Sequence, residues 1–111
     1  MLIFVCSPMR GDRPYTTAKY NRNMRAAAQY SKTVVNEGHI PITPHLFFKD
    51  FMDDHDPEER EKALEMSKQL LERCDEVWVF DENGTSEGMK GEIELASQLE
   101  GNRHGTMDSR R

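Results

Sequence analysis

Three segments of the sequence combine residue types that do chemistry with residues that turn the chain. In the last of them, Thr85-Ser86-Glu87-Gly88 opens a run with helical spacing, so its backbone amides and the Ser86 hydroxyl form a candidate anion site. Glu92 follows within the second turn, beside the apolar face of the same run. A carboxylate in such a place is suited to act as a nucleophile or a base. Glu94 points about 200° round the helix from Glu92, so only one of the two can face a crevice.

The first segment follows a short apolar run, Leu2 to Cys6, and offers a second candidate anion site. The Ser7 hydroxyl, the Arg10 guanidinium and the backbone amides between them could hold a phosphate group. The segment has neither a Walker motif nor a Gly-x-Gly-x-x-Gly motif. An ordinary turn with solvated arginines is therefore the alternative interpretation.

The middle segment places acidic residues and histidines around an aromatic patch. Its candidate site residues are Asp50, Asp53, Asp54 and His45. The aromatic rings could stack on a nucleobase, and one of the carboxyl groups could exchange a proton with that base. The alternative is a hydrophobic flap whose acids are solvated or cap the next helix. The histidines and cysteines of the chain lack the spacing of a metal site, and neither a metal nor another cofactor is expected.

The elements that position these segments alternate between strand and helix. Apolar runs predict strands at 2–6 and 77–80, with a shorter edge strand at 39–44, where two prolines cannot donate hydrogen bonds. Helical spacing predicts helices at 20–35, 57–74 and 89–99. This alternation indicates an α/β fold, a three-layer α/β/α, Rossmann-like (flavodoxin-like) arrangement around a parallel sheet. The three segments should then converge beyond the carboxyl ends of the strands, where such sheets bind ligands.

Local signals set the ends of two of these helices. Asp56 can cap the second helix, Pro57 suits its first position, and Glu59 stands three residues after the cap. Gly38 follows the first helix at the position that favours a left-handed backbone. The aromatic stretch at 45–52 is expected to be a loop.

Length and charge limit the classes of protein that the chain can represent. Its 111 residues allow one domain, expected at 1–100 and followed by a disordered polar tail at 101–111. A net charge of −5 argues against a protein that binds a nucleic-acid polymer. The same charge is compatible with the binding of a single nucleotide. No apolar run approaches the ~18 residues of a membrane span, so no membrane partner is expected. Cys6 and Cys74 are expected to be reduced and buried, which suits a cytoplasmic protein.

Four motifs between residues 2 and 99 resemble the nucleoside 2-deoxyribosyltransferase-like superfamily, most closely its small bacterial and phage members. The motifs are Phe4-Val5-Cys6-Ser7-Pro8-Met9-Arg10-Gly11, Gly38-x-x-Pro41-x-x-Pro44-His45, Arg73-Cys74-Asp75-Glu76-Val77-Trp78-Val79-Phe80 and Ser86-Glu87-Gly88-Met89-Lys90-Gly91-Glu92-Ile93. The last is the most specific of the four. Characterised enzymes of the superfamily cleave the N-glycosidic bond of 2′-deoxynucleosides or their 5′-monophosphates through a glutamate that attacks C1′.

The resemblance assigns roles to residues of this chain. It places the nucleophile at Glu92 and the groups that hold the sugar or the 5′-phosphate at Ser7, Arg10, Gly11, Ser86 and Gly88. The proton donor to the departing base stays open among Asp50, Asp53 and Asp54. The implied activity is that of a nucleotide N-glycoside hydrolase or a deoxyribosyltransferase, and a phosphate-binding first loop favours the hydrolase. Neighbouring subunits often complete the site in these enzymes, so a homodimer or a larger homo-oligomer is expected.

The sequence departs from the superfamily at three places. Phe4 stands where the characterised enzymes have a tyrosine that positions the glutamate, and Leu64 stands near the position of an acidic residue. No strand of the type Gly-Ile-Pro-Val follows the last helix, so we expect a sheet that lacks this edge strand or whose edge a partner subunit covers. A nucleotide binder without catalysis is the alternative to an enzyme. A third hypothesis is an interaction module that uses the apolar residues Phe47, Phe48, Phe51 and Met52.

Overall fold

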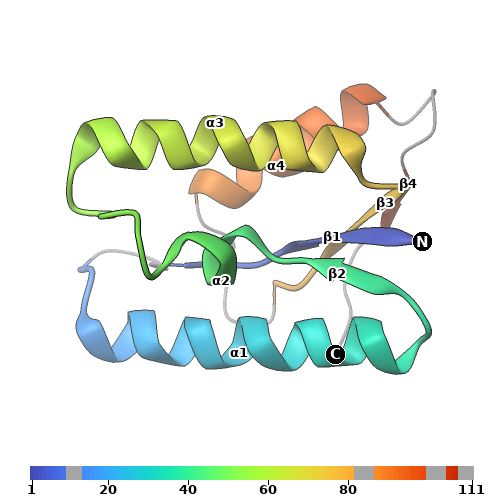
Figure 1. Ribbon diagram of the computed structural model, residues 1–111, viewed down its shortest axis with the longest axis horizontal. Helices are drawn as coiled ribbons and strands as arrows, with labels where there is room; N and C mark the ends of the chain where they lie inside the picture. The colour runs from blue at the N-terminus through green and yellow to red at the C-terminus, as the bar shows by residue number, and fades with distance from the viewer. Residues whose placement is uncertain (10–13, 82–86, 100–104, 108–111) are drawn as a thin grey trace.

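The structure, a computed structural model of the 111-residue chain, describes residues 1–9, 14–81, 87–99 and 105–107. Strands and helices alternate through these ranges (Figure 1). The strands are β1 (Leu2–Cys6), β2 (Ile40–Ile42), β3 (Glu76–Val79) and β4 (Gly105–Met107), and the helices are α1 (Thr17–Asn36), α2 (Pro44–Phe48), α3 (Pro57–Arg73) and α4 (Glu87–Leu99). None of the described helices is long and apolar enough to cross a membrane.

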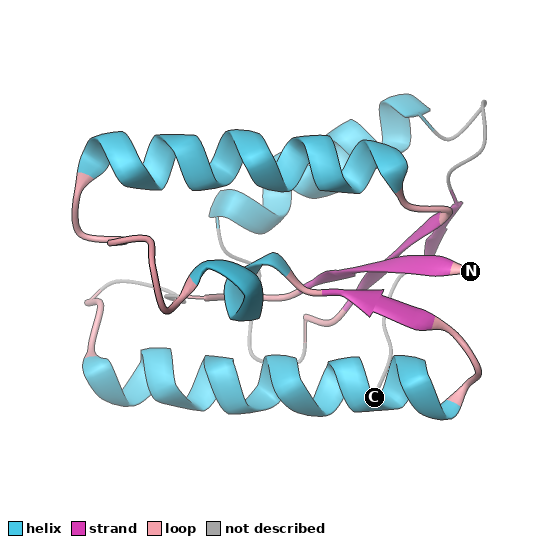
Figure 2. Cartoon of the chain, in the orientation of Figure 1, coloured by secondary structure: helices cyan, strands magenta, loops and turns pink. Residues whose placement is uncertain are grey.

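The strands form one parallel sheet in the order β2-β1-β3-β4 (Figure 2). Flavodoxin-like doubly wound sheets have this order, and in them the direction of strand succession reverses between β1 and β3. β1 pairs with both of its neighbours, so that Phe4 lies opposite Ile42 on one side and Val77 on the other. The structure confirms the predicted three-layer α/β fold with the first strand at the centre of the sheet.

Successive side chains of β1 and β3 enter two cores, one on each face of the sheet. The core on the side of α3 and α4 holds Phe4, Cys6, Leu71, Cys74, Val77, Val79, Met89 and Ala96. The core on the side of α1 holds Ile3, Val5, Tyr30, Val34, Trp78 and Phe80. Figure 1 shows these layers, with α1 on one face and α3 and α4 on the other. Strands buried on both faces are the reason for the near-continuous apolar runs in the sequence.

The ends of the long helices follow the local signals. The Asp56 carboxylate accepts a hydrogen bond from the Glu58 amide at 3.0 Å, and Pro57 is the first residue of α3. Glu59 does not close a capping box, because its Oε1 accepts the amide of Asp53 at 2.9 Å instead. That bond ties the segment before α3 to the helix. Gly38 has a φ of 89° after the end of α1, which confirms its predicted place.

Two expectations about local structure are wrong. The stretch at 45–52 begins in a helix, because the Thr43 carbonyl accepts the amides of Leu46 and Phe47 and starts α2. The stretch at 101–111 is not wholly a disordered tail, because Gly105–Met107 pair with β3 as the edge strand β4. The same pairing corrects the expectation of a sheet that lacks its last edge strand. A three-residue strand is too short to show apolar alternation in the sequence, and it forms where an open edge of the sheet supplies its hydrogen-bond partners.

Candidate functional site

The carboxyl ends of β1 and β3 lie side by side where the strand order reverses, and open α/β sheets bind ligands at this point. Ser7 follows β1 directly, and Asp81 follows β3 after one intervening residue. Helix α4, the next described element after β3, brings Glu92 against the end of β1, where it shares a hydrogen bond with Cys6. Ser7 and Glu92, predicted from distant segments, thus belong to one edge of the sheet.

Glu92 is a carboxyl group enclosed by protein, with 6% of its surface exposed. Burial raises the pKa of Glu92 from 4.5 to about 7, and the hydrogen bond from Cys6 opposes that rise. Glu94 is exposed, which confirms that only one carboxyl group of the pair faces inward. Buried carboxyl groups that titrate near neutral pH are concentrated at functional sites.

The Cys6 thiol contacts Glu92 from the end of β1. Its side chain is fully buried, and Sγ lies 3.9 Å from the carbonyl oxygen of Met89, about one helical turn before Glu92. Burial, the Glu92 carboxylate and the charge of Asp81 raise the pKa of the thiol well above its usual value. Cys6 is therefore a protonated thiol rather than a reactive thiolate, and its one S–H faces two acceptors, the Met89 carbonyl oxygen and the Glu92 carboxylate.

Ser7 has a fully buried side chain, and its Oγ has no hydrogen-bond partner among the residues that the structure describes. The Ser7 carbonyl oxygen accepts a hydrogen bond from Nε2 of His45 at 2.5 Å. Burial lowers the pKa of His45, while the Ser7 carbonyl and the charge of Asp54 act in the opposite direction. The structure thus brings Ser7 and His45 together, as predicted. A buried hydroxyl without a partner is costly, and a polar ligand at this edge would satisfy it.

Asn23 of α1 also shapes this edge of the sheet. Its Nδ2 donates a hydrogen bond to the carbonyl oxygen of Met9 at 3.0 Å, which fixes the chain two residues after Ser7. Its Oδ1 is buried and, within the described part of the chain, has no partner. Asn23 is absent from the residues predicted from the sequence. The available signal was a polar residue one turn before Ala27, on the face that α1 buries.

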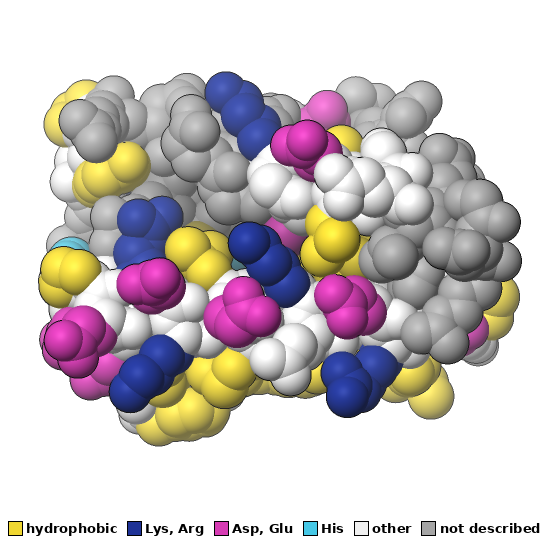
Figure 3. Space-filling view, turned by 90° about the horizontal axis from the view of Figure 1, so that it is seen from above, with side chains coloured by type: hydrophobic (Ala, Val, Ile, Leu, Met, Phe, Trp, Pro, Cys, Tyr) yellow, Lys and Arg dark blue, Asp and Glu magenta, His cyan; other side chains and the backbone are white. Residues whose placement is uncertain are grey.

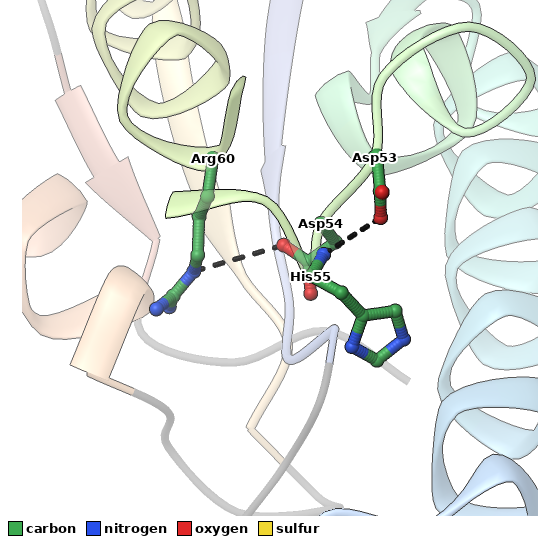
Figure 4. A network of polar contacts seen from close by, with 4 residues as sticks. All are labelled: Asp53, Asp54, His55 and Arg60. Carbon is green, nitrogen blue, oxygen red and sulfur yellow. Dashed lines mark hydrogen bonds and ion pairs between the residues drawn. The ribbon is translucent and has the colours of Figure 1, made fainter. Parts of the chain in front are cut away.

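A cleft of about 520 Å³ opens between the start of α1 and the segment that joins α2 to α3. Its described lining residues are Tyr15, Thr16, Thr17, Tyr20, Asn21, Met52, Asp53, Asp54 and His55. This volume lies within the ~300–1,000 Å³ of small-molecule sites. Figure 4 shows the acidic side of the cleft, where Asp54 Oδ1 lies 3.6 Å from Arg60 Nε and Asp53 Oδ1 accepts the His55 amide at 2.9 Å.

The remaining predicted residues have different positions. Asp53 and Asp54 line the cleft, with Asp53 exposed and Asp54 half-buried, whereas Asp50 is exposed and is not among the described lining residues. Gly88 is the second residue of α4. The residues Arg10, Gly11 and Ser86 lie outside the described residues. Within the described ranges, no group of three His, Cys, Asp or Glu side chains could hold a metal ion.

Two of the three places where the sequence departs from the superfamily that it resembles bring no polar group to Glu92. Phe4 is fully buried in the core on the α3–α4 side, and Leu64 on α3 is 37% exposed. Asp81 was not predicted either, although a polar residue just after a buried strand was a usable signal. Tyr20 and Asn21 gave no such signal, because only the fold brings the start of α1 against the segment before α3.

Charge is distributed differently on the outer helices and in the cleft. The face of the molecule formed by α3 and α4 carries acidic and basic side chains close together (Figure 3). The described lining of the cleft contains Asp53 and Asp54 but no lysine or arginine. Arg60, beside the cleft, offsets part of this charge, since its Nε lies 3.6 Å from Asp54 Oδ1.

Comparison with known proteins identifies the family of this chain. The family model for a domain of unknown function, DUF7768, matches residues 1–103. No curated protein matches the chain significantly. The match includes both strands of the reversal point, the segment before α3 and Glu92. Since it covers most of the sequence, we conclude that the protein belongs to the DUF7768 family, whose function is not established.

Proposed function

We propose that this protein cleaves the N-glycosidic bond of a nucleoside 5′-monophosphate or a nucleoside, with Glu92 as the nucleophile. One observation carries the proposal: Glu92 is a buried carboxyl group with a pKa of about 7, held by Cys6 beside the reversal point of the sheet. A hydrolase passes the sugar to water, and a deoxyribosyltransferase passes it to a second base.

The reaction follows from the chemistry of a buried carboxylate beside a glycosidic carbon. Ionised Glu92 attacks C1′ while the C1′–N bond breaks and leaves its electron pair on the base, through a transition state with oxocarbenium character. A donor protonates the departing base, and Asp53 and Asp54 in the cleft are the candidates. Water then attacks C1′, Glu92 leaves as a carboxylate, and the proton of the water passes to solvent.

Other features support the same proposal. The buried Ser7 hydroxyl can bind a sugar hydroxyl or a phosphate oxygen. The free, buried cysteines Cys6 and Cys74 suit the reducing environment of the cytoplasm, which we infer as the location. The proposal includes a homodimer or larger homo-oligomer, for which Phe51, next to the cleft and 66% exposed, offers apolar surface.

A nucleotide binder without turnover is the second candidate. It is favoured by Phe4, which is buried in the core and supplies no hydroxyl to orient Glu92. Such a protein would keep the buried Ser7 and the cleft as a ligand site and would not use Glu92 as a nucleophile.

Incubation of the purified protein with deoxynucleoside 5′-monophosphates, deoxynucleosides and ribonucleotides tests the proposal, with free base followed by chromatography. We expect base release by the wild type and none by Glu92→Gln, which has nearly the same shape. Release at equal rates by both proteins would contradict the role of Glu92. No release from any substrate, together with a thermal shift by one of them, would establish the binder instead.

A further inference from the structure

Two buried polar side chains at the carboxyl end of β1 each have an atom that lacks a hydrogen bond. Ser7 is 0% exposed and Asn23 is 1% exposed. Ser7 Oγ and Asn23 Oδ1 have no partner among the residues that the structure describes. A buried polar atom that has lost water and gained no hydrogen bond destabilises the fold. Two such atoms in one place need a reason, and a ligand or an ordered water that supplies the missing bonds is one.

The structure places these two side chains close together. Asn23 Nδ2 donates to the Met9 carbonyl oxygen at 3.0 Å, and Met9 is two residues after Ser7. Because consecutive Cα atoms are about 3.8 Å apart, those of Ser7 and Met9 are separated by about 7.6 Å at most. Figure 1 shows the first half of α1, which carries Asn23, at the same end of the molecule as the carboxyl end of β1. One small ligand can therefore contact both side chains.

The Asn23 side chain is not explained by packing or by its bond to Met9. Asn23 lies on the face of α1 that buries Ala27, Tyr30 and Val34, where an apolar side chain is the usual residue. The bond to Met9 uses only the amino group of the amide, and within the described ranges it leaves the acceptor Oδ1 without a partner. The hydrogen-bond donor that Oδ1 requires is what characterises the ligand.

The chemistry of the two atoms favours a hydroxyl group over a phosphate group. Asn23 Oδ1 only accepts hydrogen bonds, whereas the Ser7 hydroxyl both donates and accepts them. A sugar hydroxyl can donate to Asn23 while it accepts from Ser7. A phosphate monoester has a second pKa of about 6, so at neutral pH its oxygens are acceptors and would face Asn23 Oδ1 with no proton between them.

We propose that Ser7 and Asn23 form a subsite that binds the 3′-hydroxyl of the substrate's sugar. This inference rests on the proposed function, which supplies the class of ligand. The 3′-hydroxyl is the one that all the proposed substrates share, because deoxynucleosides lack the 2′-hydroxyl and monophosphates lack a free 5′-hydroxyl. Ser7 directly follows Cys6, whose thiol contacts Glu92, and C3′ is two bonds from C1′. A sugar with C1′ against Glu92 therefore keeps its 3′-hydroxyl near the end of β1.

Binding to the Glu92→Gln protein tests the subsite without turnover. The probes are the four common deoxynucleosides, their 5′-monophosphates and the 2′,3′-dideoxy form of each, which lacks only the 3′-hydroxyl. Titration calorimetry should give a dissociation constant at least about tenfold higher for the dideoxy form of each ligand that binds, because the buried polar atoms then stay unpaired.

Variants at the two residues separate binding of the hydroxyl from a structural role. Added to Glu92→Gln, Asn23→Leu and Ser7→Ala should each reduce the ratio of the two dissociation constants by about threefold or more. A side chain that only holds the fold would weaken both forms equally and leave the ratio unchanged. Ser7→Ala removes one hydroxyl group, so it keeps the test valid if Asn23→Leu disturbs the chain at Met9. Gln29→Leu, which removes an exposed amide from the same helix, is the matched control and should leave the ratio unchanged.

The outcomes separate the subsite from the proposed function. Equal binding of the deoxy and dideoxy forms would show that ordered water alone satisfies Ser7 and Asn23, and it would overturn the subsite while the proposed function stands. A ratio that both variants leave intact would also overturn the subsite. The expected ratios without base release from any probe by the wild type would support the subsite and overturn the proposed function. Failure of every probe to bind would overturn both.

Discussion

Glu92 receives its hydrogen bond from a thiol two residues along β1 from Phe4. Phe4 and Cys6 lie on the same face of the strand, because side chains alternate in direction, and both belong to the core under α3 and α4. Phe4 fills that core, and Cys6, at the carboxyl end of the strand, donates to Glu92. The chain thus places a thiol donor beside the Glu92 carboxyl group from the carboxyl end of β1.

The ionisation of Glu92 predicts an acid limb in the pH profile. A nucleophilic carboxyl group must be ionised, and the pKa of Glu92 is about 7. We expect kcat/KM for base release to fall about tenfold for each pH unit below that value and to level off above it. A profile that stays flat from about pH 5 to pH 8 would contradict the assignment.

Changes at Cys6 should move that limb. The thiol favours the ionised form of Glu92, so Cys6→Ala should raise the apparent pKa of the acid limb, by about one pH unit for one hydrogen bond to a charged group. Cys6→Ser keeps a donor and should return the midpoint toward the wild-type value. Equal profiles for the alanine and serine variants would show that the hydrogen bond does not control Glu92.

Among the elements, α4 positions Glu92, and the segment before α3 forms part of the cleft. The Asp53 amide is held by Glu59 on the first turn of α3, so this helix fixes one wall of the cleft. The start of α1 forms the other wall, and the turn after α1 leads to the edge strand β2. Gly38 lies in that turn and Gly91 lies within α4, and the two glycines differ in backbone conformation.

Two Gly→Ala substitutions should have opposite effects on stability. Gly38 has a φ of 89°, and an alanine Cβ there would meet no atom of another segment within 4 Å, so Gly38→Ala should cost about 1 kcal/mol through the backbone alone. Gly91 lies inside α4 with the same open space, so Gly91→Ala should stabilise by up to about 1 kcal/mol. Urea unfolding of both variants measures the difference. The same sign for both changes would contradict the backbone explanation.

Across the whole molecule, the buried Glu92 links folding to pH. Its pKa is about 7 in the folded protein and 4.5 for an unperturbed glutamate, so the folded state holds an extra proton between these values. The stabilisation by the protonated form is complete below pH 4.5 and is lost as pH rises through 7. This loss corresponds to about 3 kcal/mol.

Removal of the titrating group should remove this dependence. Glu92→Gln cannot ionise, so we expect it to unfold at higher urea concentration than the wild type at about pH 8 and to lose most of that advantage at about pH 5. Chemical denaturation at the two pH values provides the measurement. An equal difference between variant and wild type at both pH values would show that Glu92 is not buried as a carboxyl group.

Features that depend on neighbours along the chain could be predicted from the sequence alone. The apolar runs located β1 and β3, Asp56 and Pro57 located the start of α3, and helical spacing showed that Glu92 and Glu94 face different ways. These are consequences of local periodicity and backbone chemistry, which a short stretch of sequence reveals.

The meeting of distant groups is visible only in the folded chain. Cys6 contacts α4 across 83 positions of sequence at Met89, and His45 reaches the Ser7 carbonyl across 38. The cleft likewise needs the start of α1 and the segment before α3 together, and β4 needs the edge of β3. Such contacts depend on the order of strands in the sheet and on how the helices pack across it, and no periodicity within one segment encodes them.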